Sequence, residues 1–170
     1  MKQGPKFRVK PRRQREGKTN YRKRLKLLKS RKPRIVVRKT LKNIIVQFVK
    51  YNPQGDEILA SAISSELKNK KYNWKFSTSN TPAAYLTGLL AGKRAAEKGI
   101  KEGILDIGLH HPSTGSKVFA VVKGIEEAGI SCPCDPSKIP SEDRLLGKYL
   151  NETLPKEVEN IKNKILGKGA

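Results

Sequence analysis

The amino-acid sequence predicts an α/β fold, in which helices pack on a mixed sheet made of a three-strand antiparallel meander and one further strand. β-Branched and apolar runs recur between residues 34 and 64, as in consecutive strands. Two stretches with helical spacing and capping signals follow, and a short apolar run lies between them. The order of three strands, helix, strand and helix is typical of an α/β layer domain. An extended basic N-terminal arm and helix precede this domain, and C-terminal helices follow it.

The N-terminal segment is basic and polar. Pro5 and Pro11 oppose helix formation in residues 1–16, which cannot bury enough apolar surface to order themselves. This arm is therefore expected to be disordered until it binds a partner. A basic helix is expected over residues 20–29, with Thr19 as its cap and a narrow apolar stripe at helical spacing. Its cations are expected to face outward.

The strands follow Pro33. Residues 34–40 and 43–51 are β-branched runs separated by a short polar turn, which predicts a β-hairpin. After a turn rich in Asn, Pro and Gly, residues 57–64 predict a third antiparallel strand. Residues 68–79 are polar and predict a loop.

The helical half begins with a strong N-terminal signal. Asn80 or Thr81 is expected to cap a helix that runs to about residue 98, where Gly99 stops it. Small residues such as Gly88 and Gly92 along this helix indicate a close approach to the sheet or to an RNA backbone.

The second helix and the tail come next. Residues 104–108 predict a fourth strand, and the second helix is expected to begin at Gly115 or Ser116 and to end at Gly129. A proline-broken loop and two short charged helices, over residues 141–151 and 155–166, are expected after it. The chain is thus expected to divide into a basic RNA-binding arm and helix (residues 1–32), an α/β globular domain (33–130), and a loop with a C-terminal helical extension (131–170).

Charge is distributed unevenly. The formal net charge is +22, and residues 1–50 hold 20 Lys and Arg against one acid, Glu16, a balance of +19. The other residues hold 17 Lys and Arg against 14 acids, a balance of +3. Such a one-sided block favours a polyanionic partner. Nucleic acid is favoured over a membrane, because the sequence has neither an apolar run of 18 residues nor an apolar segment after its basic start.

Residues 108–117 lie between the fourth strand and a helix, where backbone N–H groups can face an anion. Six residues separate Gly108 and Gly115, and Ser116 precedes Lys117, so the spacing of a nucleotide-binding P-loop is absent. The loop could instead hold a backbone phosphate of RNA, or be a plain connection. Its donors are His110, His111, Ser113, Thr114, Ser116 and Lys117.

Catalysis and metal binding are not expected. Asp106, a histidine and a serine of the same loop could form a triad, but no nucleophile elbow accompanies them. One residue separates Cys132 from Cys134, which is tighter than usual zinc-ligand spacing, so free thiols are expected. The sequence therefore predicts no cofactor, no metal and no small-molecule substrate.

Three long motifs carry a family resemblance. They cover residues 15–28, residues 80–95 and residues 105–120, and the third includes the stretches Asp-Ile-Gly-Leu-His and Gly-Ser-Lys-Val-Phe-Ala. The three motifs follow one another in the same order as in that family. Together they resemble the archaeal and eukaryotic branch of the universal eighteenth large-subunit ribosomal protein, which binds 5S ribosomal RNA. The resemblance implies a cytoplasmic ribosomal location in the central protuberance, where the family bridges 5S rRNA and the large rRNA beside neighbouring large-subunit proteins.

The resemblance also implies which residues contact rRNA. From the arm and the basic helix these are Lys6, Arg8, Lys10, Arg12, Arg13, Arg15, Lys18, Tyr21, Arg22, Lys23 and Arg24. From the hairpin and the loop after the fourth strand they are Arg38, Lys39, Lys42, Asn43, His110 and Lys117. Two positions depart from the family pattern: His111 stands where Arg is expected, and Asn20 where Asp is expected. The tail after Asn151 matches nothing in the pattern.

Three functions are compatible with the composition. The first is a structural rRNA-binding ribosomal protein, and the second is a nucleic-acid-processing enzyme that uses the loop at residues 110–117. The third is an RNA chaperone that acts away from the ribosome. The charge distribution does not separate the first from the third, but the long motifs favour the first.

Overall fold

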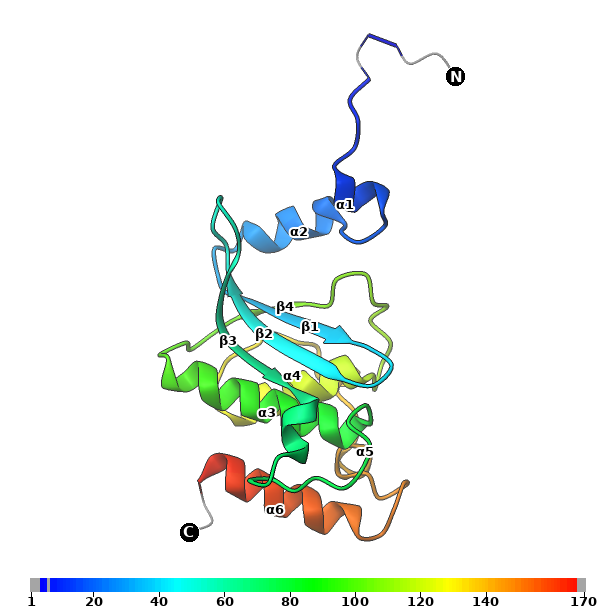
Figure 1. Ribbon diagram of the computed structural model, residues 1–170, viewed down its shortest axis with the longest axis vertical. Coiled ribbons are helices and arrows are strands. Elements are labelled where there is room, and N and C mark those ends of the chain that lie inside the picture. The colour runs from blue at the N-terminus through cyan, green and yellow to red at the C-terminus, as the bar shows by residue number, and fades with distance from the viewer. Residues whose placement is uncertain (1–3, 6, 168–170) are drawn as a thin grey trace.

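The computed structural model describes residues 4–5 and 7–167 of the 170-residue chain. The sheet lies in the middle of the molecule, with α2 on one face and α3 and α4 on the other (Figure 1). The helices are α1 (Arg12–Arg15), α2 (Tyr21–Leu28), η1 (Ser64–Lys68), α3 (Thr81–Glu97), α4 (Lys117–Glu127), η2 (Pro136–Lys138), α5 (Glu142–Leu146) and α6 (Leu154–Leu166). The strands are β1 (Arg34–Lys39), β2 (Ile44–Lys50), β3 (Glu57–Ile63) and β4 (Ile104–Asp106).

The sheet has the order β3-β2-β1-β4. β1 pairs antiparallel with β2, and β2 with β3, while β4 lies parallel to β1. This arrangement confirms the predicted meander with one added strand. The parallel register places Asp106 beside Val36 and Ile104 beside Arg34. The carboxyl end of β4 and the loop after it therefore lie next to β1.

The core lies between the sheet and the helix pair α3–α4. Ile35, Val37, Val46 and Phe48 are fully buried on the face of the sheet that these helices cover. Successive side chains of a strand point to opposite faces, so Arg34, Val36 and Arg38 of β1 point toward α2. A single strand thus supplies apolar side chains to the core and cationic side chains to the other face.

Backbone contact between α3 and α4 explains the small residues along α3. A Cβ built on Gly88 would lie 2.3 Å from the carbonyl oxygen of Val121, and one built on Gly124 would lie 2.2 Å from that of Tyr85. Real atoms do not approach so closely, so both positions require glycine. The prediction that Gly88 and Gly92 approach the sheet or an RNA backbone was wrong, because both meet the facing helix α4 and its C-terminal end instead.

Two further details of the N-terminal elements differ from the predictions. Asn20, rather than Thr19, caps α2, since its side chain accepts a hydrogen bond from the Lys23 N–H at 3.1 Å. A helical turn, α1, forms where prolines were expected to prevent one. Pro11 occupies the N-cap of α1, a position at which its missing N–H costs no intrahelical hydrogen bond.

The C-terminal helix α6 packs against α3 (Figure 1). Leu154, Val158, Ile161 and Ile165 recur at helical spacing and join the same buried cluster as the sheet residues. The predicted division of the chain at residue 131 stays a prediction.

A polar cluster links α6 to both core helices. Tyr85 Oη donates to Glu127 Oε2 at 2.6 Å, and Lys162 Nζ lies 2.6 Å from the same oxygen. Burial, followed by the hydrogen bond to Glu127, raises the pKa of Tyr85 to about 12. Burial alone would raise the pKa of Glu127, but the bonds from Lys162 and Tyr85 outweigh it and lower that pKa. Glu127 is therefore a charged acceptor shared by three helices.

Candidate nucleic-acid interface

The N-terminal arm leads away from the rest of the molecule and presents its cations to solvent (Figure 1). The exposed cations that the structure describes in this segment are Arg8, Lys10, Arg12, Arg13, Arg15 and Lys18. Its one acid, Glu16, is paired with Lys18 Nζ at 2.8 Å. Lys6, which was also predicted to contact RNA, lies outside the described residues. The arm therefore presents many cations to a polyanion, and its own acid competes little for them.

Residues 11–19 fold back on themselves and bring α1 to the start of α2. Gly17 takes a left-handed φ of +64°, and the N–H groups of Lys18 and Thr19 both donate to the Arg13 carbonyl, at 2.9 and 3.2 Å. Arg13 Nε also donates to Thr19 Oγ1 at 2.9 Å. These bonds hold the Arg13 side chain beside the first turn of α2.

A chain of ion pairs fastens α2 to the sheet. Arg24 donates to both carboxylate oxygens of Asp56, at 3.0 and 2.8 Å. Arg34 donates to Asp56 at 2.6 Å and to Asp106 at 2.9 Å. The Arg34 side chain is only 4% exposed, so its pairs lie in a medium where charges interact more strongly than at an open surface. The chain links α2, β1, β4 and the turn between β2 and β3.

The loop after β4 lies against the end of β1. Gly108 has a left-handed φ of +61°, and a Cβ built there would lie 2.7 Å from Nη1 of Arg38. The Gly108 N–H donates to Asp106 at 2.9 Å. Burial lowers the pKa of His110, and the positive charges of Lys39 and Arg38 lower it further. His110 is therefore a neutral hydrogen-bonding group at pH 7.

The remaining loop residues are more exposed. His111 Nδ1 lies 3.2 Å from Ser113 Oγ, and Lys138 Nζ donates to Thr114 Oγ1 at 3.3 Å. Ser116 is the N-cap of α4, and Lys117, in the first turn, is exposed. The loop thus presents polar groups, although its two histidines are not paired with each other.

The β1–β2 turn is the fourth predicted contact segment. Thr40 closes the turn with two hydrogen bonds to the carbonyl oxygen of Asn43. The Thr40 N–H donates one at 2.8 Å, and the Thr40 Oγ1 donates the other at 2.9 Å. Lys39 and Lys42 are exposed, and Leu41 at the tip is 97% exposed. The turn therefore presents cations around an apolar tip.

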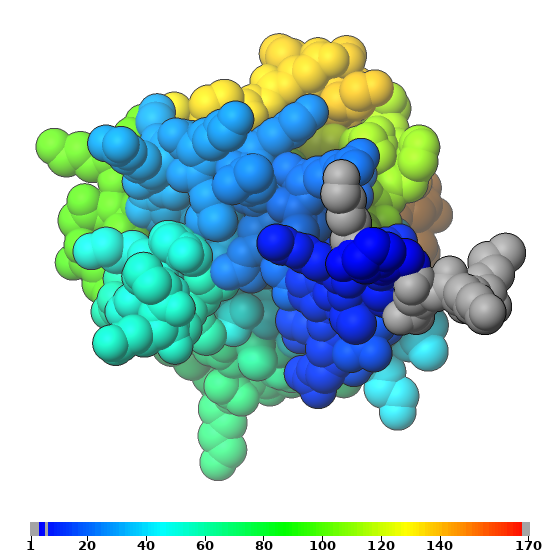
Figure 2. All heavy atoms as spheres, turned by 90° about the horizontal axis from the view of Figure 1, so that it is seen from above, coloured from blue at the N-terminus to red at the C-terminus, as the bar shows by residue number. Residues whose placement is uncertain are grey.

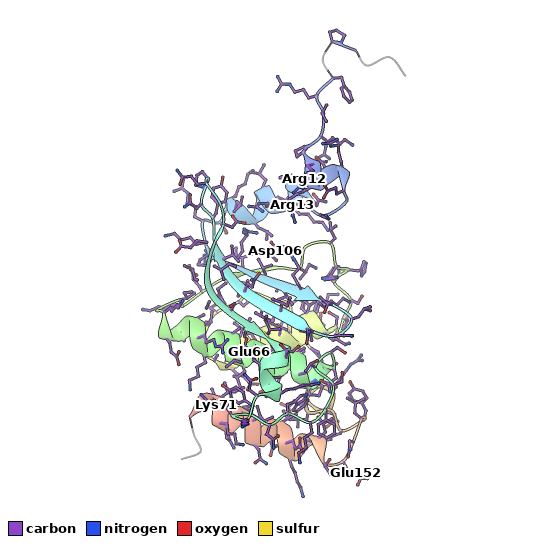
Figure 3. The ribbon with its side chains drawn as sticks, in the orientation of Figure 1. Arg12, Arg13, Glu66, Lys71, Asp106 and Glu152 are labelled. Carbon is purple, nitrogen blue, oxygen red and sulfur yellow. The ribbon has the colours of Figure 1, made fainter. Side chains whose placement is uncertain are left out.

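One small cavity brings the arm, α2, β1 and the loop after β4 together. Its cationic lining residues are Arg13, Lys18, Lys23, Arg24, Arg34 and Arg38. Asp106 is the one acid in the lining, and it is already bonded to Arg34. Figure 3 shows Asp106 on the α2 side of the sheet, below Arg12 and Arg13, while Glu66 and Glu152 lie farther down the molecule. Viewed from above, the arm and α2 lie over this end of the molecule (Figure 2).

Not every predicted contact residue lies at the cavity. Tyr21 instead lines a neighbouring groove with Leu25 and Tyr51. The cavity lining also excludes the arm residues before Arg13, together with Arg15, Arg22, Lys39, Lys42, Asn43, His110 and Lys117. The predicted contact residues therefore surround the cavity and do not form one compact patch.

The sequence interpretation missed residues that build this centre. Arg34 was taken only as the start of a strand, and Asp56 only as part of a turn, although the two form an ion pair. The one available signal was a cation at the head of an otherwise buried apolar run. Asp106, weighed as a triad member, bonds Arg34 and a backbone N–H instead of a histidine.

The part of the chain that the structure describes holds neither a metal-ligand cluster nor an apolar helix of membrane length. It contains no group of three His, Cys, Asp or Glu side chains suited to hold a metal ion. Both cysteines are free thiols, and burial raises the pKa of Cys132 to about 12. No helix between residues 7 and 167 is both long and apolar enough to cross a bilayer.

Comparison with known families decides the identity. Residues 5–102 match the family described as ribosomal large subunit proteins 60S L5, and 50S L18. The chain belongs to this family. The match covers the arm, the whole meander and α3, so it includes most segments of the candidate interface.

Two archaeal relatives extend the 60S L5 and 50S L18 match over the rest of the chain. The large ribosomal subunit protein uL18 of Staphylothermus marinus is 48% identical over 176 residues, covering 99% of this chain and 87% of the relative. The uL18 protein of Korarchaeum cryptofilum is 51% identical over 150 residues, covering 88% of this chain and 76% of the relative. The predicted resemblance is thereby confirmed.

Membership in the 60S L5 and 50S L18 family sets the functional class. The protein is a structural component of the large subunit of the ribosome and not an enzyme. The predicted location in the ribosome follows from the same relatives. The alternative of a nucleic-acid-processing enzyme is therefore set aside.

Proposed function

We propose that this protein binds 5S rRNA through its arm and the α2 side of its sheet, and helps to attach it to the large rRNA in the central protuberance. The observation that carries the proposal is the convergence of the arm, α2, β1 and the loop after β4 at one cavity. Cations from the arm, α2 and β1 line one cavity, and residues 108–109 of the loop after β4 complete it. Neighbouring large-subunit proteins would complete the surroundings.

The binding energy in this proposal is mainly electrostatic. Each Lys or Arg that neutralises a phosphate releases condensed counterions, so affinity falls with salt by roughly 0.7 to 0.9 log units per contact for each log unit of salt. The first 50 residues hold 20 such cations against one acid. Even partial engagement of this segment would dominate the affinity.

The folded part of the chain has a different role in this proposal. Residues 1–32 supply most of the charge, whereas residues 33–130 fix where those charges lie relative to one another. The helices α5 and α6 pack against α3 and are proposed to face away from the 5S rRNA contact. The predicted contact residues are retained in full, from Lys6 to Lys117, and Arg34 is added as a group that organises them.

A salt series with two RNAs tests the proposal. The full chain would be titrated with 5S rRNA and with an unrelated folded RNA of equal length, at salt concentrations from low to physiological. We expect tighter binding to 5S rRNA and a steep salt dependence for both RNAs. Equal affinity for the two RNAs would contradict the choice of 5S rRNA. A flat salt response would contradict the role of the arm.

Backbone footprinting on 5S rRNA then tests the residue set. Protection by the full chain would be compared with protection by a chain that lacks residues 1–16. We expect the shorter chain to lose part of the protected nucleotides, while those contacted by Arg38, Lys39 and the loop after β4 stay protected. Identical footprints would exclude the arm from the contact.

A further inference from the structure

We propose that the cavity beneath α2 is a preformed site for one tetrahedral oxyanion, filled in the ribosome by a single backbone phosphate of RNA. The source of that phosphate rests on the proposed function, whereas the anion site itself does not. The six cations that line the cavity come from three separate segments of the chain. Only the fold brings them together, so the site exists before any RNA arrives.

A buried guanidinium forms part of this site. Arg34 is 3% exposed and lines the cavity, and its Nε has no hydrogen-bond partner among the residues that the structure describes. Buried N–H donors are almost always paired in proteins, so an unpaired one points to an absent acceptor. The other nitrogens of Arg34 are already committed to Asp56 and Asp106. Nε itself has almost no accessible surface, so an oxyanion in the cavity would accept from it only after the guanidinium turns, while the positive charge of Arg34 acts on the cavity without that movement.

The first turn of α2 adds a second source of positive potential. Asn20 and Lys23 both line the cavity, so the N-terminal end of α2 faces it. This end of a helix carries unsatisfied N–H groups and a partial positive charge, which favour an anion. No acidic residue occurs in the first turn of α2 to occupy that role.

The cavity has room for one oxyanion. Its volume is about 60 Å³, which is space for more than a single water molecule. A phosphate group, with one phosphorus and four oxygens, is a small guest of this kind. The lining presents cations from three segments and the first turn of α2, which favour a charged phosphate over an uncharged base. The site would thus recognise the backbone and not the base.

The acids near the cavity do not cancel its charge. Asp106 is held by Arg34 and by the Gly108 N–H, and Asp56 is shared by Arg24 and Arg34. Arg13 is bonded by its Nε to Thr19, and its terminal nitrogens form no ion pair with any described residue. Lys18 is paired with Glu16. The cations Lys23 and Arg38 form no ion pair with any described residue and remain available for an anion.

Inorganic phosphate tests the anion site without RNA. The full chain would be titrated with phosphate at pH 7, with chloride replaced so that ionic strength stays constant, and binding followed by calorimetry and by phosphorus NMR. We expect saturable one-to-one binding for the natural chain. Lys23→Gln and Arg38→Gln should each weaken it by about tenfold, because each removes a charged donor. Absence of saturable binding would overturn the proposal.

Lys26→Gln is the matched control, because it makes the same charge change on the same helix at a residue outside the lining. It should leave phosphate affinity unchanged. An equal loss in Lys26→Gln and Lys23→Gln would mean that only overall charge matters, which overturns a defined site. Circular dichroism of each variant checks that the fold is kept.

A competition experiment identifies the source of the phosphate. Binding of 5S rRNA would be measured in phosphate and in chloride at equal ionic strength. If the cavity takes an RNA phosphate, free phosphate weakens RNA binding by the natural chain but has less effect on Arg38→Gln. If RNA binds equally well in both salts while phosphate still binds, the occupant is a free phosphate ion and the RNA source is overturned. Loss of RNA binding under every condition would instead contradict the proposed function.

Discussion

The two faces of the sheet are built on different physical principles. Toward α3 and α4, fully buried apolar side chains such as Ile35, Val37 and Phe48 meet helices whose backbones touch at glycines. Toward α2, the contact runs through Arg24, Asp56, Arg34 and Asp106. Both faces belong to the same strands.

The difference separates stability from recognition. Apolar burial contributes roughly 25 cal/mol for each Å² removed from water and is not weakened by ionic screening. Ion pairs lose much of their gain to desolvation, but they hold charges at defined positions. We therefore expect changes on the helix-covered face to alter folding, and changes on the α2 face to alter anion binding. Four experiments test whether the two faces have these separate roles.

Removing residues 1–16 should have the largest effect. The deletion takes away seven cations. If about four of them contact phosphates, affinity for 5S rRNA at about 0.1 M salt should fall on the order of 1,000-fold, or about 4 kcal/mol. The free energy of unfolding should change little, because this segment is exposed. Filter binding and urea denaturation measure the two quantities.

A double replacement of His110 and His111 by Ala is the comparison for that deletion. The two histidines lie in the loop after β4, and His110 is neutral at pH 7. We expect a loss of affinity on the order of 30-fold, since each side chain would lose a hydrogen bond that contributes about 1 kcal/mol. Equal losses from the deletion and the double replacement would contradict the leading role of the arm.

Asp106→Ala should have the next largest effect, here on stability. It would leave Arg34 buried with only Asp56 as a partner, and breaking a buried pair costs about 3 kcal/mol. Asp143→Ala is the control, because Asp143 pairs with Lys148 at an exposed position. Urea denaturation should find a much smaller loss for Asp143→Ala. Similar losses would mean that the buried pairs do not anchor the α2 side.

Gly124→Ala tests the helix-covered face. The added methyl group would meet the Tyr85 carbonyl, so α3 and α4 must separate, at a cost of about 2 kcal/mol. Once folded, the variant should bind 5S rRNA as the natural chain does. Gly4→Ala, where nothing lies within 4 Å, is the control and should not change stability. A loss of RNA affinity in folded Gly124→Ala would show that the two faces are coupled.

The smallest effect concerns pH. Because the folded state lowers the pKa of His110 below 6.5, the unfolded chain binds this proton more readily. Its contribution to stability is complete above pH 6.5 and is lost as the pH falls through the folded pKa. His110→Gln should remove this dependence, which we expect to be below about 0.5 kcal/mol for a partly exposed group. Thermal unfolding between pH 5 and pH 7.5 would measure it, and an unchanged pH profile in the variant would contradict the assignment.

The fold was largely predictable from local patterns. The strands of the meander, the caps of α3 and the glycine after it follow from side-chain periodicity and backbone conformation, which depend on neighbours in sequence. The cap of α2 was placed one residue early, because Thr19 and Asn20 are both good caps. Only the structure shows that the Thr19 hydroxyl is used by Arg13.

The centre of the candidate site was less predictable. The charge imbalance identified the arm and α2 as cationic, yet no local pattern pairs Arg34 with Asp56, which lies 22 positions later, or with Asp106, which lies 72 positions later. Those pairs depend on β4 lying beside β1, a fact of sheet order. Long-range electrostatic geometry therefore needs the fold, whereas net charge does not.

The fastening of α2 has a practical consequence for the whole ribosomal particle. The bonds that would hold RNA are ionic and exposed, so added salt screens them strongly, whereas the ion pairs that place α2 are partly or fully buried and are screened much less. A high-salt wash of ribosomes should then release this protein with α2 and the helical core in place. Dilution back to low salt should restore RNA binding without any refolding of the core.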